Sequence, residues 1–177
     1  MSEVDERLPS ESPADPAADI YDEEGVIRGD FVSRVEEAIA TSDRDVLRNE
    51  VGSLHESEVG DLIEALQPEE RRMLVGLMGE DFDFAALTEV DGAIRSDIVD
   101  NLPNAQIAQA VQEMDSDDAV YILEDLDQQD RDEILAQLPF TERIRLRRAL
   151  DYPEETAGRR MQTEFVAVPP FWTVGQT

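Results

Sequence analysis

Residues 115–138 read DSDDAVYILEDLDQQDRDEILAQL, which is one 12-residue unit repeated twice. Each copy begins with polar and acidic residues and carries apolar residues at unit positions 8, 9 and 12. The same frame extends without a gap in both directions and gives eight units over residues 55–150. Positions 8, 9 and 12 are apolar at 23 of 24 places, with Arg147 as the exception, whereas a hydrophobic content of 41% gives about 10 by chance.

The period of 12 predicts a stack of short helices. Unit positions 5, 8, 9 and 12 are spaced i, i+3, i+4 and i+7, which is one face of a helix. A continuous helix would rotate that face by about 120° per unit, because each residue turns by about 100°. The chain must therefore break once per unit, and helix-breaking residues stand at unit positions 1 or 2: Pro68, Gly79, Gly92, Pro103 and Pro139. Helices of about eight or nine residues are unstable alone, so we expect an all-α fold, a right-handed superhelix or solenoid.

Two further helices are predicted before the repeat. Residues 31–40 place four apolar side chains on one helical face: Phe31, Val35, Ala38 and Ile39. Asp30 has the position of an N-cap, and a second helix follows within residues 43–54. The prediction is therefore a domain of about ten short helices over residues 31–150.

The segments outside this domain have a different composition. Residues 1–30 hold ten acidic residues, two arginines and three prolines, which is typical of a disordered tail. Residues 151–177 begin as a linker, and residues 165–168 followed by two prolines are typical of a short β-strand. We therefore expect an acidic tail, a helical domain and the beginning of a second domain.

The charge of the chain excludes several classes of protein. There are 43 acidic and 15 basic residues, all 15 of them arginine, and the net charge is -28. Nucleic acids and anionic membrane surfaces need a basic face, which this chain lacks. With no cysteine, one histidine, no membrane-spanning apolar run and no secretory signal, we expect a soluble cytoplasmic protein without thiolate or multi-histidine metal sites. The expected partners are cationic: metal ions or basic protein surfaces.

Motifs typical of catalysis are absent, so we expect no enzyme. The single histidine, His55, begins a unit, where capping of a helix is the simpler interpretation. Many acids stand in the first turn of a predicted helix, where the helix dipole favours them: Glu69, Glu70, Asp117, Asp118, Asp130 and Glu142. Together they make an acidic surface that suits hard divalent cations, which take oxygen ligands. Charge alone does not choose magnesium over calcium.

The last unit contains a basic cluster formed by Arg143, Arg145, Arg147 and Arg148. One interpretation is that these exposed charges neutralise neighbouring acidic helices. The other is a docking face for another domain or for the acidic linker. The sequence leaves both open.

The repeat, followed by YPEETAGRRM (152–161) and TEFVAV (163–168), resembles the cytoplasmic N-terminal region of the MgtE family of magnesium transporters and channels. The resemblance implies a homodimeric membrane protein in which this region lies at the cytoplasmic face of the inner membrane. It also implies that a tandem pair of CBS domains, beginning near Met161, and a transmembrane pore follow in the full-length chain. In such a protein, weak regulatory Mg²⁺ binding at acidic interfaces gates the pore.

The resemblance also indicates candidate metal ligands. The family's acidic pattern at the start of a late helix matches Asp117 and Asp118. Family members often have a further acid where this chain has Tyr121, and another of their acids aligns with Ala85, so Glu89 is the nearest acid on that face. The candidate metal site is therefore Asp117, Asp118 and Glu89.

Two alternatives remain open at the level of sequence. A helical-repeat scaffold for protein interactions, similar to flagellar motor-switch modules, has similar short helices without ion sensing. The acidic charge can also serve only solubility in a salty cytoplasm, with no ligand at all.

Overall fold

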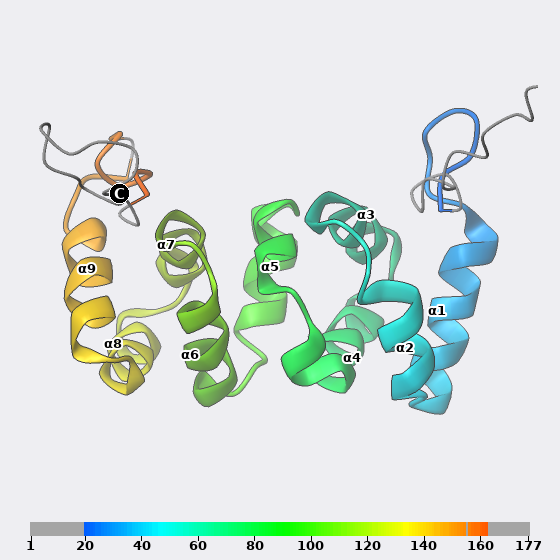
Figure 1. Cartoon of the computed structure of the whole chain (residues 1–177), viewed down its shortest axis with the longest axis horizontal. Helices are drawn as coiled ribbons and strands as arrows, with labels where there is room; N and C mark the ends of the chain where they lie inside the picture. Colours follow the sequence, from blue (N-terminus) through cyan, green and yellow to red (C-terminus); the bar gives the residue numbers. More distant parts are fainter. Residues whose placement is uncertain (1–19, 155, 163–177) are drawn as a thin grey trace, which may run out of the picture.

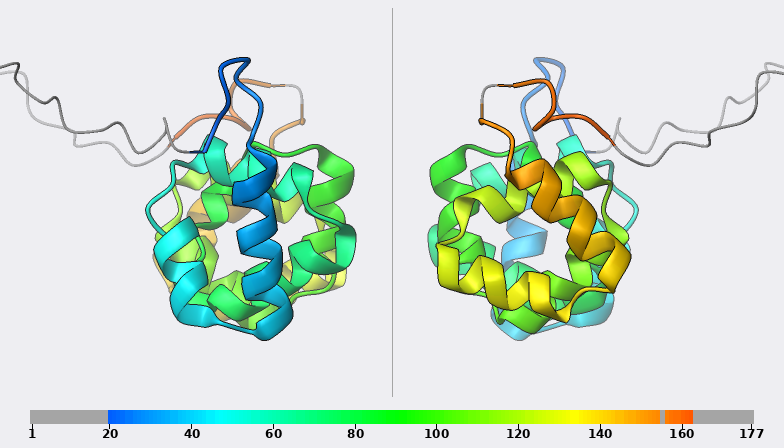
Figure 2. Two further views of the ribbon diagram at one scale, coloured as in Figure 1. Left: turned by 90° about the vertical axis from the view of Figure 1, so that its right-hand side faces the viewer. Right: turned by 90° about the vertical axis from the view of Figure 1, so that its left-hand side faces the viewer.

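The computed structural model describes residues 20–154 and 156–162, and this part of the chain is helical. It contains nine α-helices: α1 (Gly29–Thr41), α2 (Arg44–Val51), α3 (Glu56–Ala65), α4 (Pro68–Met78), α5 (Gly92–Val99), α6 (Asn104–Glu113), α7 (Ser116–Asp125), α8 (Gln128–Gln137) and α9 (Phe140–Leu150). The helices follow one another from one end of an elongated stack to the other, and seen from either end they surround a common axis (Figures 1 and 2). The predicted all-α stack of short helices is confirmed. The β-like segment predicted at residues 165–168 lies outside the described residues.

The core follows the 12-residue repeat. Unit position 8 is buried in all eight units: Leu62, Leu74, Ala86, Ile98, Ala110, Ile122, Ile134 and Leu146. Position 9 is buried in seven units, and the exception is the exposed Arg147 of α9. Position 12 is buried in five units and half-buried in the other three. The apolar stripe of each short helix therefore faces the inside of the stack, as the repeat predicts.

The unit at residues 79–90 departs from the predicted α-helix. It forms two 3-10 helices, η2 (Gly79–Asp81) and η3 (Phe84–Thr88). Gly79 has a φ of 58°, which ends α4, and the side chain of Asp83 accepts a hydrogen bond from the Ala85 N–H at 3.0 Å. The rings of Phe82 and Phe84 are both buried and meet edge to face at 5.2 Å. Two aromatic side chains two residues apart cannot share one face of an α-helix, so burying both requires the tighter, broken path.

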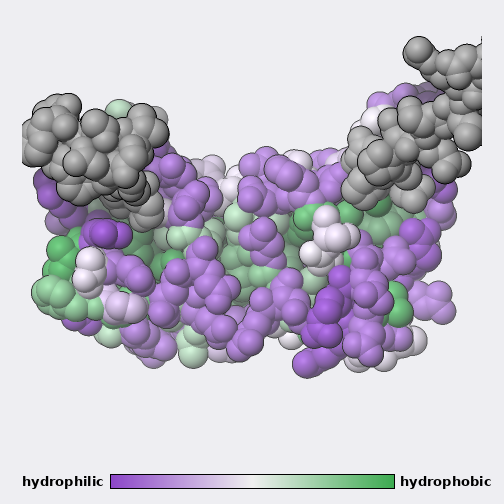
Figure 3. Space-filling model, viewed as in Figure 1, coloured by the Kyte–Doolittle hydropathy of each residue, from purple (hydrophilic) through white to green (hydrophobic). Residues whose placement is uncertain are grey.

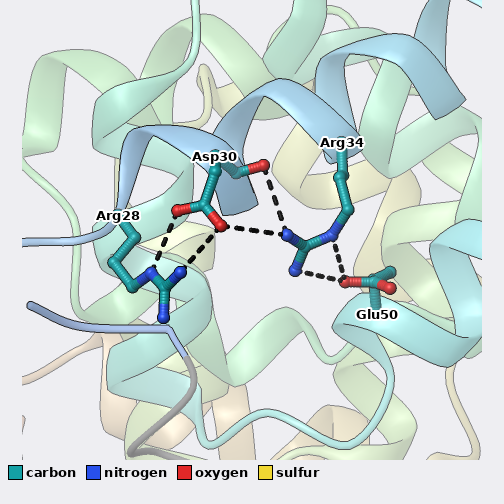
Figure 4. Close-up of polar contacts among 4 residues, drawn as sticks. All are labelled: Arg28, Asp30, Arg34 and Glu50. Carbon is teal, nitrogen blue, oxygen red and sulfur yellow. Dashed lines mark hydrogen bonds and ion pairs between the residues drawn. The ribbon is translucent and has the colours of Figure 1, made fainter.

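The N-terminal end differs from the prediction in detail. Helix α1 buries Phe31 and the three other predicted apolar residues, but it begins at Gly29 with Arg28 as its N-cap, so the prediction of Asp30 as the N-cap was wrong. The carboxylate of Asp30 instead pairs with Arg28 at 2.9 Å and with Arg34 at 3.4 Å, and Arg34 continues to Glu50 on α2 (Figure 4). Two guanidinium groups compete for this carboxylate, which leaves it no role as a helix cap.

Residues 20–28, which the sequence places in an acidic tail, contact the stack. The side chain of Ile20 is buried in the core. The Tyr21 hydroxyl donates a hydrogen bond to Asp61 Oδ2 on α3 at 2.7 Å. The remainder of the predicted tail, residues 1–19, lies outside the described residues.

The residues at several helix starts have the capping and first-turn positions predicted from the sequence. His55 is the N-cap of α3: its Nδ1 accepts from the Ser57 N–H at 3.4 Å, and its own N–H donates to Glu58 Oε2 at 2.7 Å. The predicted capping role of His55 is confirmed. The acids predicted for first turns, among them Glu70 of α4, lie in the first turns of α4, α7, α8 and α9.

Three of the four arginines at unit position 5 bind the end of the preceding helix. The guanidinium of Arg71 donates to the carbonyl oxygens of Ile63 and Glu64 at 2.8 and 3.1 Å. Sixty residues later, Arg131 donates to the carbonyl oxygens of Leu123, Glu124 and Leu126 at 2.9, 3.2 and 2.7 Å. Arg143 reaches the Ala136 carbonyl oxygen in the same way at 3.4 Å. Carbonyls at the end of a helix lack the N–H partner four residues further on that carbonyls inside the helix have, and a planar guanidinium can bind two or three of them at once.

Candidate acidic site

A groove of about 470 Å³ lies between η2, η3, α6 and the first turns of α3 and α7. Seven carboxylates line it: Glu56, Glu80, Asp81, Asp83, Glu113, Asp115 and Asp118. Its apolar wall includes Phe82, Phe84 and Met114. We call this feature the acidic groove. It forms because α3 and α7 both begin here with acids in their first turns, beside the acidic 3-10 segment and the C-terminal half of α6.

The negative charge is compensated at one end of the acidic groove and not at the other. Asp81 pairs with Arg48 of α2 at 2.5 Å, and this guanidinium holds the pKa of Asp81 below its ordinary range. At the other end, burial raises the pKa of Asp118 from 3.8 to about 6, and the charges of its acidic neighbours add to the rise, led by Asp117 and Glu56. The Asp118 carboxylate therefore lies in uncompensated negative potential.

The structure places the three predicted ligands around this end of the groove. Asp118 lines it, and Asp117 lies beside Asp118 with its Oδ1 buried and without a hydrogen-bond partner in the described part of the chain. Glu89 is exposed at the C-terminal end of η3, and its charge contributes to the raised pKa of Asp118. Within residues 20–154 and 156–162, no three histidine or carboxylate side chains are arranged to hold a metal ion by themselves. The three residues are neighbours and do not form a closed coordination site.

Sequence reasoning missed two of the four acids whose charges raise the pKa of Asp118. Glu56 and Asp115 both line the groove and both raise the pKa of Asp118. They stand at unit positions 2 and 1, where the repeat predicts helix starts, so the position was visible in the sequence. Asp115 belongs to the same unit as Asp118, whereas the approach of Glu56 from another unit was not visible, because it depends on how the stack brings α3 next to η3 and η3 next to α7.

The raised pKa of Asp118 predicts that this residue makes the protein less stable as the pH rises from about 4 to above 6. Its pKa is higher in the folded protein, so between about pH 4 and pH 6 the folded state binds more protons than the unfolded state. This contribution to stability is present at pH 4 and lost as the pH rises through 6. Replacing Asp118 with asparagine should therefore raise the free energy of unfolding at pH 7 by about 1 kcal/mol, after allowance for solvent screening of a half-buried group.

Urea denaturation at pH 4, 5, 6 and 7 measures this effect. The gain from Asp118→Asn should shrink toward zero at pH 4, where the wild-type carboxyl is protonated. Asp100→Asn is the matched control, since Asp100 is exposed at the end of α5 and is not among the residues that line the groove. An equal gain in both variants at every pH would contradict the assignment.

The described part of the chain is thus a helical-repeat domain with an acidic groove. Within the residues described, no helix has both the length and the hydrophobicity needed to cross a bilayer. The chain belongs to the MgtE intracellular N domain family, whose model matches residues 54–155.

Comparison with solved structures supports the fold. A crystal structure described as "the soluble part of a magnesium transporter" superposes with a TM-score of 0.61 at 24% sequence identity, covering 77% of this chain and 54% of that chain. The present chain therefore spans about half the length of that structure. No curated protein matches the sequence.

Proposed function

We propose that this chain is a cytosolic regulatory domain of a magnesium transporter or channel, and that its acidic groove binds Mg²⁺ weakly. Membership of the MgtE intracellular N domain family supports the first part. The observation that carries the second is the environment of Asp118, where burial and the charges of acidic neighbours raise the pKa of the carboxyl to about 6. A group that binds a proton this readily is also one that gains from a nearby cation.

The geometry favours a shared site over a closed one. Mg²⁺ keeps several waters and needs only one or two carboxylates from any one surface. One or two ligands of this kind are available from Asp117, Asp118 and Glu89. The three carboxylates do not surround a common point where they could hold an ion by themselves. In this proposal a second acidic surface, from a CBS domain, the transmembrane part or the partner subunit of a homodimer, supplies the remaining ligands. Loss of Mg²⁺ then leaves two acidic surfaces that repel, which provides the signal to the pore.

Titration with MgCl₂ tests binding to the chain itself. We expect NMR chemical-shift changes at Asp117, Asp118 and neighbouring amides at millimolar MgCl₂, beyond those in NaCl of equal ionic strength. The changes should be reduced at least ~3-fold in Asp118→Asn, because one of the few available carboxylate charges is removed. Asp100→Asn should titrate as wild type. Equal responses to MgCl₂ and to ionic strength would sink ion sensing by this domain.

One observation is relevant to the alternative of an interaction scaffold. On α9, the side chains of Phe140 and Ile144 are 70% and 48% exposed. Hydrophobic surface is visible over α9 at the left end of the stack (Figure 3). The final helix of a repeat protein usually has a polar outer face. A contact at this end is compatible with either function, and the MgCl₂ titration separates them.

A further inference from the structure

The residues that follow α9 fold back along the stack. After Leu150 the chain turns, with hydrogen bonds from Thr156 N–H to the Pro153 carbonyl and from Arg159 N–H to the Thr156 carbonyl, at 3.1 and 3.0 Å. We call residues 151–154 and 156–162 the C-terminal strap. Composition alone classes this segment as a linker. In the structure, however, the segment is held against the helical stack by specific contacts.

Arg159 is the centre of the C-terminal strap. The residue is only 4% exposed although it is charged. Its guanidinium donates to the carbonyl oxygens of Leu150 and Tyr152, and its Nε donates to Glu124 Oε2 on α7 at 3.3 Å. These bonds join the end of α9, the strap and α7 through a single side chain.

Arg160 adds a second attachment to the same helix. Its guanidinium pairs with Glu124 Oε1 at 2.8 Å and lies over the Tyr121 ring, 4.7 Å from the centroid. The same ring receives Arg95 of α5 at 4.0 Å. Glu124, with a side chain only 14% exposed, thus uses one carboxylate oxygen for each of the two strap arginines.

The strap also depends on a close backbone approach. A Cβ added to Gly158 would lie 2.8 Å from Cδ1 of the Tyr152 ring, a distance that real Cβ contacts essentially never show. Further along, the side-chain amide of Gln162 donates to Asp115 Oδ2 at 2.9 Å. Packing, ion pairs and a terminal hydrogen bond therefore all hold the strap against the stack.

From these contacts we infer that the C-terminal strap is a cation-independent clamp that fixes the direction in which the chain leaves the helical stack. Glu124 is its positioning residue. Because arginine stays charged at all accessible pH values, the two guanidinium groups neutralise Glu124 without a metal ion. The acids of α7 therefore differ in whether an arginine compensates their charge. Asp117 and Asp118 in the first turn remain uncompensated, and Glu124 in the last turn is occupied by the protein itself.

The clamp has a consequence for how the domain moves. A free linker after Leu150 would make residues 151–162 a hinge between the stack and the chain that follows. A clamped strap moves as one body with α7 and α9, and any hinge lies further along the chain. This inference does not depend on Mg²⁺ binding at the acidic groove.

Limited trypsin digestion tests the clamp, because trypsin cleaves this lysine-free chain only after arginine. In wild-type protein with EDTA, cleavage after Arg159 and Arg160 should be slow, since it requires local opening of the strap. Glu124→Gln keeps the side-chain shape and removes the charge, and it should speed both cleavages at least ~10-fold. Glu133→Gln, at an exposed position of α8, is the matched control and should leave both rates unchanged.

A second variant guards against loss of folding. Gly158→Ala perturbs the strap through the Tyr152 ring and leaves the helical stack untouched, so it should also speed cleavage with unchanged far-UV circular dichroism. Two results would overturn the inference. One is equal cleavage in wild type and both variants. The other is protection of the wild-type strap that appears only when MgCl₂ is added, which would show that a divalent cation holds it.

Discussion

Replacing Leu74 with alanine is expected to lower the free energy of unfolding by about 3–5 kcal/mol, the range for a large-to-small change at a fully buried site. Leu74 is 0% exposed in the middle of α4. Helix α4 packs against α1, α2 and α5, so a cavity in its buried face weakens a helix that contacts three others. Each of those helices is too short to be stable alone, and the lost contacts have no replacement within the helix.

Urea denaturation followed by circular dichroism measures the loss, and the preceding residue provides its control. Met73 is 44% exposed on the same helix, so Met73→Ala should cost less than about 1 kcal/mol. Comparable costs at both positions would mean that the unit positions do not define the inside of the stack.

The second large effect is expected at a buried ion pair. Arg95 of α5 is 4% exposed and its Nε donates to Asp125 Oδ2 on α7 at 2.5 Å. Asp125→Ala removes the counter-charge and leaves a buried guanidinium, which typically costs about 3–5 kcal/mol. The loss should appear as a lower urea midpoint and a lower thermal midpoint.

An exposed ion pair on the same protein gives the comparison. Arg147 and Asp132 lie 3.8 Å apart with half-exposed side chains. Asp132→Ala should therefore cost less than about 0.5 kcal/mol, because solvent already screens the pair. If Asp125→Ala costs no more than Asp132→Ala, the Arg95 side chain does not depend on Asp125 in solution.

Local periodicity explains why the core was predictable. Leu74 and the other residues at unit positions 8 and 9 were assigned to the inside of the stack from spacing alone, and all but Arg147 are buried. Helix starts were equally accessible, because proline, glycine and acidic residues act within one turn. Asp30 shows where prediction from local sequence fails: its residue type suits an N-cap, but Arg28 and Arg34 bind its carboxylate.

Contacts between units were not predictable in the same way. Arg95 looked like one of the arginines scattered through an acidic chain, and its burial depends on Asp125, thirty residues away. The pKa of Asp118 is raised by burial and by the charges of neighbouring acids, among them Glu56, which belongs to another unit. Residues 79–90 fit the 12-residue pattern and still form 3-10 helices, since Phe82 and Phe84 both need burial. The contacts of Arg95 and Asp118 depend on how units stack on one another, and the sequence of a single unit does not specify that arrangement.

The stacking order of the helices gives the domain mechanical compliance. The principal contacts join elements close in chain order, such as α7 with α9 and α6 with α8, while α1 and α9 lie at opposite ends (Figure 1). Small rotations at successive helix–helix interfaces add up along such a stack. A ligand that changes the angle between two neighbouring helices would therefore displace the far end of the stack, so that a small local change becomes a larger movement at a distance.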